Sequence, residues 1–124
     1  MKYGIYYAYW EKEWNGDYKY YIDKISKLGF DILEISCGAF SDYYTKDQEL
    51  IDIGKYAKEK GVTLTEGYGP HFNESLSSSE PNTQKQAISF WKETLRKLKL
   101  MDIHIVGGAL YGYWPVDYSK PFDK

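Results

Sequence analysis

Residues 27–36, KLGFDILEIS, run from the end of a helix pattern through one glycine into an apolar strand pattern. Upstream of this joint, apolar side chains recur at helical spacing from Asp17 until Gly29 ends the repeat. A second joint of the same kind, KGV, stands at 60–62. Short joints between alternating helices and strands are typical of right-handed crossovers, so the sequence predicts a parallel α/β sheet.

The same alternation extends in both directions from this joint. Strands are expected at 2–8, 30–36, 62–67 and 103–109, and helices at 17–28, 50–60 and from about 81 to 98. Seven elements of this kind predict one domain over residues 1–124, with about four strands and three helices. An eight-stranded α/β barrel needs roughly 250 residues, so the sequence predicts half of a (β/α)8 barrel.

Composition excludes several functional classes. The 16 basic and 18 acidic side chains nearly cancel, and the lysines are scattered, so nucleic acid is not expected as a partner. The pattern of a signal peptide and an apolar run of membrane-spanning length are both absent, so no membrane association is expected. Cys37 is the only cysteine, which indicates a reducing compartment such as the cytoplasm and a small buried side chain.

Aromatic residues gather in the loops that follow the predicted strands, which form the functional edge of an α/β barrel. The chain has 14 tyrosines and 4 tryptophans, and many stand in the segment GIYYAYWEKEW at 4–14. Rings can stack on the C–H faces of a sugar, while Tyr6 supplies a hydroxyl and Trp14 an indole N–H. We expect Tyr6 and Trp14 to bind a ligand, and most of the other rings to pack in the core or at an interface.

The third strand pattern, VTLTEGYGP at 62–70, contains two residues of interest. Gly67 either lets a ligand approach the backbone or simply forms a turn. Glu66 stands at the end of an apolar run and is either a catalytic base or metal ligand, or a strand-end carboxylate in water. The solvated interpretation is favoured over the catalytic one.

Other motifs carry less chemistry. Glu66, His71 and His104 lack the spacing of known metal motifs, so a metal site built from them is disfavoured. Gly107 and Gly108 do not fit a phosphate loop, and they indicate close approach of a ligand or of the backbone. The serine run at 77–79 is interpreted as a loop and helix cap, since no histidine and acid partner marks a nucleophile.

Four segments together resemble the bacterial ketose 3-epimerases, the family that acts on D-psicose (D-allulose) and D-tagatose. They are GIYYAYWEKEW, KLGFDILEIS, the GYGP turn and DIHIVGGALYGYWPVDYSKP. The resemblance spans the chain and implies the N-terminal half of a (β/α)8 barrel of the xylose-isomerase-like group. It also implies an isomerase that removes a proton from C3 of a ketohexose and returns one to the opposite face.

In the family, two glutamates act as acid and base, and a divalent ion, Mn²⁺, Co²⁺ or Mg²⁺, polarises the C2 carbonyl and the C3 hydroxyl. The resemblance implies that these glutamates and the metal ligands come from later strands, so neither catalytic nor metal-binding residues are expected here. It implies substrate contacts for the apolar and aromatic side of the pocket: Tyr6, Trp14, Gly67, Ala109 and Trp114, with Ala8 and Leu110 as weaker matches. Glu66 departs from the family pattern, which has a small or apolar residue there.

We therefore expect the chain alone to lack epimerase activity. Half a barrel leaves the edge strands and one sheet face uncovered, so we also expect a homo-oligomer or pairing with a complementary half-barrel. One alternative is a structural assembly without catalysis. Another is a lectin-like module that binds sugars through its tyrosines and tryptophans.

Overall fold

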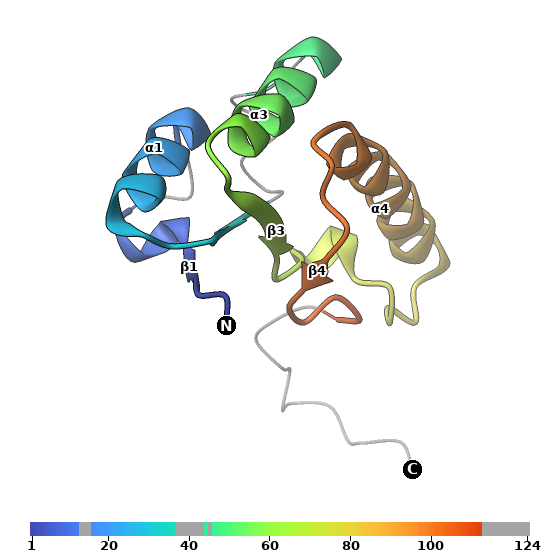
Figure 1. Ribbon diagram of the computed structural model, residues 1–124. Coiled ribbons are helices and arrows are strands. Elements are labelled where there is room, and N and C mark those ends of the chain that lie inside the picture. The colour runs from blue at the N-terminus through green and yellow to red at the C-terminus, as the bar shows by residue number, and fades with distance from the viewer. Residues whose placement is uncertain (13–15, 37–43, 45, 113–124) are drawn as a thin grey trace.

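The computed structural model describes residues 1–12, 16–36, 44 and 46–112 of the chain (Figure 1). Within these residues four strands alternate with three α-helices and two short 3-10 helices, in the order β1 (Gly4–Tyr6), η1 (Tyr7–Tyr9), α1 (Tyr18–Leu28), β2 (Ile32–Ile35), α3 (Asp47–Glu59), β3 (Thr63–Gly67), η3 (Phe72–Glu74), α4 (Pro81–Leu100) and β4 (Val106–Gly107). None of these described helices has the length and apolar character needed to cross a membrane.

The four strands form one parallel sheet in the order β1-β2-β3-β4. Each strand therefore lies beside its neighbour in the sequence, and α1, α3 and α4 connect them in an arc around the sheet (Figure 1). This arrangement confirms the predicted parallel α/β half-barrel of four strands and three helices.

The ends of α1 show why the helix begins and ends where the sequence predicts. The Asp17 side chain accepts hydrogen bonds from the backbone N–H groups of Lys19 and Tyr20, at 3.0 and 3.3 Å, and so caps the first turn. At the other end Gly29 has φ of +81°, a left-handed conformation that glycine adopts without steric cost. Pro81 likewise occupies the first turn of α4, as predicted.

The core lies between the sheet and its helices. Leu33 and Ile35 of β2 are fully buried there, together with Leu64 of β3. The helices contribute a complementary apolar side: Ile22, Ile25, Leu50, Ile53, Ala57, Trp91 and Leu98. Because side chains alternate along a strand, burying Leu33 and Ile35 against the helices turns Ile32 and Glu34 to the opposite face.

The first strand is shorter than the predicted 2–8 segment. It ends at Tyr6, and the chain then turns into η1, which brings the ring of Tyr7 into the core. That ring meets Tyr18 and Tyr21 edge-on, with centroids 5.6 and 5.7 Å away. Its burial raises the pKa of Tyr7 well above the ordinary value of a phenol.

The fourth strand is also shorter than the predicted 103–109 segment. The backbone N–H of Ile103 still bonds to the carbonyl of Leu98 at 3.0 Å, so the chain is leaving α4 at this point. Pairing with β3 starts only at Val106, and it stops after Gly107 because Gly108, with φ of +107°, turns the chain away.

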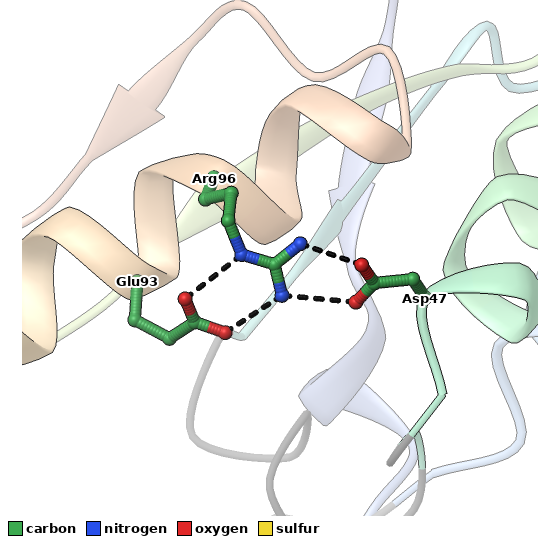
Figure 2. Close-up of polar contacts among 3 residues, drawn as sticks. All are labelled: Asp47, Glu93 and Arg96. Atoms are coloured by element: carbon green, nitrogen blue, oxygen red, sulfur yellow. Dashed lines mark hydrogen bonds and ion pairs between the residues drawn. The ribbon is translucent and has the colours of Figure 1, made fainter.

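An exposed ion cluster joins the start of α3 to α4 (Figure 2). The guanidinium of Arg96 donates two hydrogen bonds to Asp47, at 2.7 and 2.9 Å, and two to Glu93, both at 2.8 Å. These hydrogen bonds lower the pKa values of the Asp47 and Glu93 carboxyls. Because the guanidinium is planar and makes two hydrogen bonds to each carboxylate, the cluster fixes the relative positions of these three side chains.

We predict that Arg96→Met lowers the thermal midpoint of the chain modestly at neutral pH, because exposed ion pairs are screened by water. Since the folded-state pKa values are lowered, the stabilisation is complete above the ordinary values of 3.8 for Asp47 and 4.5 for Glu93, and it is lost as the pH falls through the folded-state values. Thermal unfolding followed by circular dichroism should therefore show a difference between variant and parent that shrinks in acid and in high salt. Lys92→Met, at an exposed position of the same helix, is the matched control, and an equal loss in both variants would contradict the role of the cluster.

Candidate functional site

The candidate site lies at the carboxyl ends of the strands, on the sheet face that turns away from the helices. The strand register aligns Tyr6 of β1 with Glu34 of β2, and Glu34 with Thr65 of β3. Paired residues in a parallel sheet point to the same face, so these three side chains form a row across the sheet. Gly67 follows two residues after Thr65 and lies on the same face.

Two residues predicted to contact substrate lie together in this row. The hydroxyl of Tyr6 donates to the backbone carbonyl of Gly67 at 3.5 Å, a long hydrogen bond that spans β1 to β3. The Tyr6 ring packs edge-on against Tyr7, with centroids 5.3 Å apart, and against the hydrophobic core. The ring is thus held from one side while its hydroxyl reaches across the end of β2.

Glu34 is the residue of this row that sequence reasoning missed. The Thr65 hydroxyl lies 3.4 Å from Glu34 Oε2, and a Cβ added at Gly67 would lie only 2.7 Å from Glu34 Oε1. The absence of a side chain at Gly67 therefore leaves room for the carboxylate of Glu34. The signal was present in FDILEIS, where an acidic residue alternates with the buried Leu33 and Ile35.

Glu66 lies on the other face of β3, and the interpretation of this residue as a solvated carboxylate is wrong. Its backbone pairs with Ile35 and Val106, and its side chain is fully buried on the helix side of the sheet. Alternation along the strand explains the difference, because Leu64 and Glu66 share the face opposite to Thr65 and Gly67. Glu66 is therefore separated from Tyr6 and Glu34 by the sheet itself.

The remaining predicted contact residues follow β1 and β4. Ala8 lies in η1 and Leu110 follows β4, and both are half-buried against the hydrophobic core. Ala109, between Gly108 and Leu110, is also half-buried. Trp14 and Trp114 lie outside the described residues, as does Cys37.

The loops after β3 and β4 are tied to each other beside the row. A Cβ added at Gly108 would collide with the carbonyl oxygen of Tyr68, so the predicted close approach of the backbone is confirmed there. Tyr68 N–H donates to the carbonyl of Gly107 at 3.1 Å, and Ser77 N–H donates to the carbonyl of Tyr111 at 2.9 Å. Two loops from neighbouring strands thus form one connected rim.

Glu74 fixes the shape of the loop after β3. Its Oε2 accepts hydrogen bonds from the Tyr68 hydroxyl and from the His71 backbone N–H, each at 2.7 Å, and its carbonyl accepts one from the indole of Trp91. In the same loop Ser78 Oγ accepts from the Glu80 N–H at 3.2 Å, just before α4. The serine run therefore lies in the loop, as predicted, but it does not cap α4. The N-cap residue is Glu80, which makes no side-chain capping bond, because the helix begins at Pro81.

A metal site is not assembled by the residues that the structure describes. They contain no group of three or more histidine, cysteine, aspartate or glutamate side chains that could hold an ion. His104 instead pairs with Asp102 at 2.8 Å on the surface before β4. His71 follows β3 and Glu66 is buried on the helix side, so these three residues do not converge.

We predict that Gly67→Ala displaces the Glu34 side chain, because the new methyl group and Glu34 Oε1 cannot share the same space. The end of a glutamate is flexible, so the expected cost in the free energy of unfolding is below about 1 kcal/mol. Proton–nitrogen correlation spectra should show shifted amide signals at Glu34 and Thr65. Gly69→Ala is the control, since a Cβ there meets no atom within 4 Å, and unmoved Glu34 and Thr65 signals in Gly67→Ala would contradict the placement.

The chain was compared in sequence with families and proteins that are already known. No family model matches the chain. Proteins named D-psicose 3-epimerase from Enterocloster bolteae, Ruminiclostridium cellulolyticum and Agrobacterium fabrum are 59%, 50% and 46% identical to it over all 124 residues. The chain spans 41% to 42% of the length of these relatives.

Solved structures give the same result. A D-psicose 3-epimerase with D-tagatose from Clostridium cellulolyticum H10 matches the whole chain with a TM-score of 0.91 at 50% identity, and a D-psicose 3-epimerase in the presence of D-fructose matches with 0.89 at 46%; the chain covers 42% of each. An L-ribulose 3-epimerase, with a TM-score of 0.80 at 16% identity, shares the fold. In sequence and in fold, the whole chain is thus similar to about two fifths of a bacterial ketose 3-epimerase, the family that its motifs indicated.

Proposed function

We propose that residues 1–124 act as one unit and form one wall of the sugar pocket of a metal-dependent ketohexose 3-epimerase that interconverts D-fructose and D-psicose. The observation that carries the proposal is the match over the entire chain to three proteins named D-psicose 3-epimerase, at 46% to 59% identity. The contact between Tyr6 and Gly67, two of the expected substrate positions, supports it, because it places both at the carboxyl edge of the sheet.

In this proposal the chain binds and orients the sugar. The Tyr6 hydroxyl offers a hydrogen bond, Gly67 presents only backbone at the edge of β3, and a mainly apolar surface covers the C–H faces of the sugar. Among the described residues, Ala109, Ala8 and Leu110 belong to that surface, and we propose sugar contacts also for Trp14 and Trp114, which lie outside the described residues. The carbon-bound hydrogens of the sugar are poorly hydrated, so an apolar surface binds the face of the ring that carries them. The polar groups then distinguish sugars by the positions of their hydroxyl groups.

Proton transfer at C3 requires groups that we propose to lie outside this chain. An acid and a base must face opposite sides of C3, and a divalent ion, when bound, would supply positive charge that polarises the oxygens at C2 and C3. The described residues do not fit such an ion, since they assemble no group of three ligands. The wall alone therefore positions a sugar without lowering the barrier to enolisation.

The molecular partners proposed for the chain are a ketohexose and protein surfaces. The net charge of −2 and scattered lysines give no basic patch for nucleic acid. We also propose a cytoplasmic location, because one cysteine among 124 residues suits a reducing compartment.

We predict that the chain alone, supplied with Mn²⁺, does not convert D-fructose to D-psicose above background. A graft in which these residues replace the matching part of the Enterocloster bolteae protein should be active, because 59% identity preserves most of the wall. Both proteins are assayed for D-psicose by chromatography, with the relative lacking the matching part as the control. Turnover by the chain alone, or a folded graft without turnover, would contradict the proposal.

A second candidate function is a structural one, in which the chain assembles with itself or with a complementary half-barrel. Several exposed apolar side chains favour it, because self-association would remove them from water. Tyr3 beside β1 and Ile105 before β4 are more than 60% exposed, and Ile88 and Leu95 lie exposed on α4. In the described sheet β1 and β4 each pair on one side only.

This second candidate predicts self-association of the purified chain. Size-exclusion chromatography with light scattering should give a mass above the 14.5 kDa of one chain, and the mass should fall when Ile88 and Leu95 are both replaced by glutamine. Lys85→Gln and Lys92→Gln on the same helix serve as the control. A folded monomer at all concentrations would rule the assembly out.

A further inference from the structure

Glu34 is an acidic side chain for which the resemblance and the proposed mechanism give no role. It stands at the carboxyl edge of β2, between Tyr6 of β1 and Thr65 of β3, on the face that turns away from the helices. Its neighbours in the strand, Leu33 and Ile35, are fully buried on the other face. A carboxylate in the central row of an uncharged sheet face calls for hydrogen-bond donors.

The described residues satisfy only part of this demand. A carboxylate has two oxygens and about four lone-pair sites. The Thr65 hydroxyl, at 3.4 Å from Oε2, is at the long limit of a hydrogen bond, and charge-assisted O–H···O⁻ bonds are usually about 2.5–2.7 Å. Thr65 therefore orients the carboxylate and leaves most of its capacity to accept hydrogen bonds for other donors.

The positions around Glu34 are those expected to face the sugar. Gly67 leaves the space that Oε1 occupies, since an added Cβ would lie 2.7 Å from that oxygen. The Tyr6 hydroxyl bonds to the carbonyl of Gly67 and so closes the row on the β1 side. A ligand at the place where Tyr6 meets Gly67 also lies beside Glu34, because Glu34 Oε1 occupies the space next to Gly67.

We propose that Glu34 is a further substrate-binding residue, whose carboxylate accepts hydrogen bonds from hydroxyl groups of the ketohexose. The inference rests on the proposed function and adds a determinant of sugar selectivity to it. A ketohexose carries several hydroxyl groups that can donate hydrogen bonds, and one carboxylate can accept hydrogen bonds from two neighbouring hydroxyls at once. Such a site disfavours sugars that lack the recognised hydroxyl, because the half-buried acceptor is then left without that partner.

A purely structural role for Glu34 predicts different behaviour. If the carboxylate served only to hold Thr65, then Glu34→Ala would affect all sugars alike and would act mainly through stability. If it binds the sugar, the loss depends on which hydroxyl the sugar carries. The two roles are therefore separated by comparing sugars as well as by comparing variants.

The kinetic test uses the active graft described above, with D-fructose and with deoxy analogues that each lack one hydroxyl. We expect Glu34→Ala to lower kcat/KM for D-fructose about 10- to 100-fold, the usual effect of one hydrogen bond to a charged group, chiefly through KM. The kcat/KM of Glu34→Gln should lie between the values of the parent graft and of Glu34→Ala. The loss should disappear for the analogue that lacks the bound hydroxyl, and Glu59→Ala, at an exposed position of α3, should leave activity unchanged.

The binding test uses the chain itself, so that it does not depend on turnover. Titration with D-fructose should shift the amide signals of Glu34, Thr65 and Gly67, and Glu34→Ala should abolish these shifts. An active graft in which Glu34→Ala has no effect, or an equal loss for all analogues, would overturn the inference and leave the proposed function intact. An inactive graft, together with binding by the chain that depends on Glu34, would overturn the proposed function and leave the inference about Glu34 intact. If neither turnover nor binding is observed, both the proposed function and the inference are overturned.

Discussion

The pairing of β2 with β1 on one side and with β3 on the other determines which side chains lie on each face of the sheet. It aligns Tyr6, Glu34 and Thr65, and it aligns Ile35 with Glu66 on the opposite face. A shift of one residue in either pair would exchange the two faces, bringing Glu34 into the core and Leu33 to the outside. The buried area of Leu33 and Ile35 therefore fixes which carboxylate can meet a ligand.

Contacts outside the sheet hold this arrangement at both ends. Asp23 of α1 accepts a hydrogen bond from Tyr56 of α3 at 2.8 Å and pairs with Lys60 at 2.9 Å, so the first two helices are joined at the surface. At the carboxyl edge of the sheet, Glu74 and the contacts between the loops after β3 and β4 hold the rim. The wall of the candidate pocket is thus shaped before a ligand arrives, which lowers the entropic cost of binding.

Local signals made much of the fold predictable. Asp17, Gly29 and Pro81 determine helix ends through their own backbone chemistry, and the apolar repeats gave the order of the elements. The early end of β1 and the late start of β4 depend on tertiary contacts, the burial of Tyr7 and the bond from Ile103 to Leu98, which no local pattern contains. Glu66 and Glu34 show the same limit, because the role of each carboxylate depends on which face of the sheet is covered by helices. The charge of the Glu66 side chain favoured a position in water, whereas the alternation of side chains along β3 turns it toward the helices, where it is buried.

We propose that the sheet face bearing Tyr6, Glu34 and Gly67 receives the sugar. A crystal structure of the chain, joined to the matching remainder of a D-psicose 3-epimerase and soaked with D-fructose, tests it most directly. We expect the sugar over the carboxyl ends of β1, β2 and β3, within hydrogen-bonding distance of the Glu34 carboxylate. A sugar bound elsewhere, or a Glu34 side chain turned toward the helices, would contradict it.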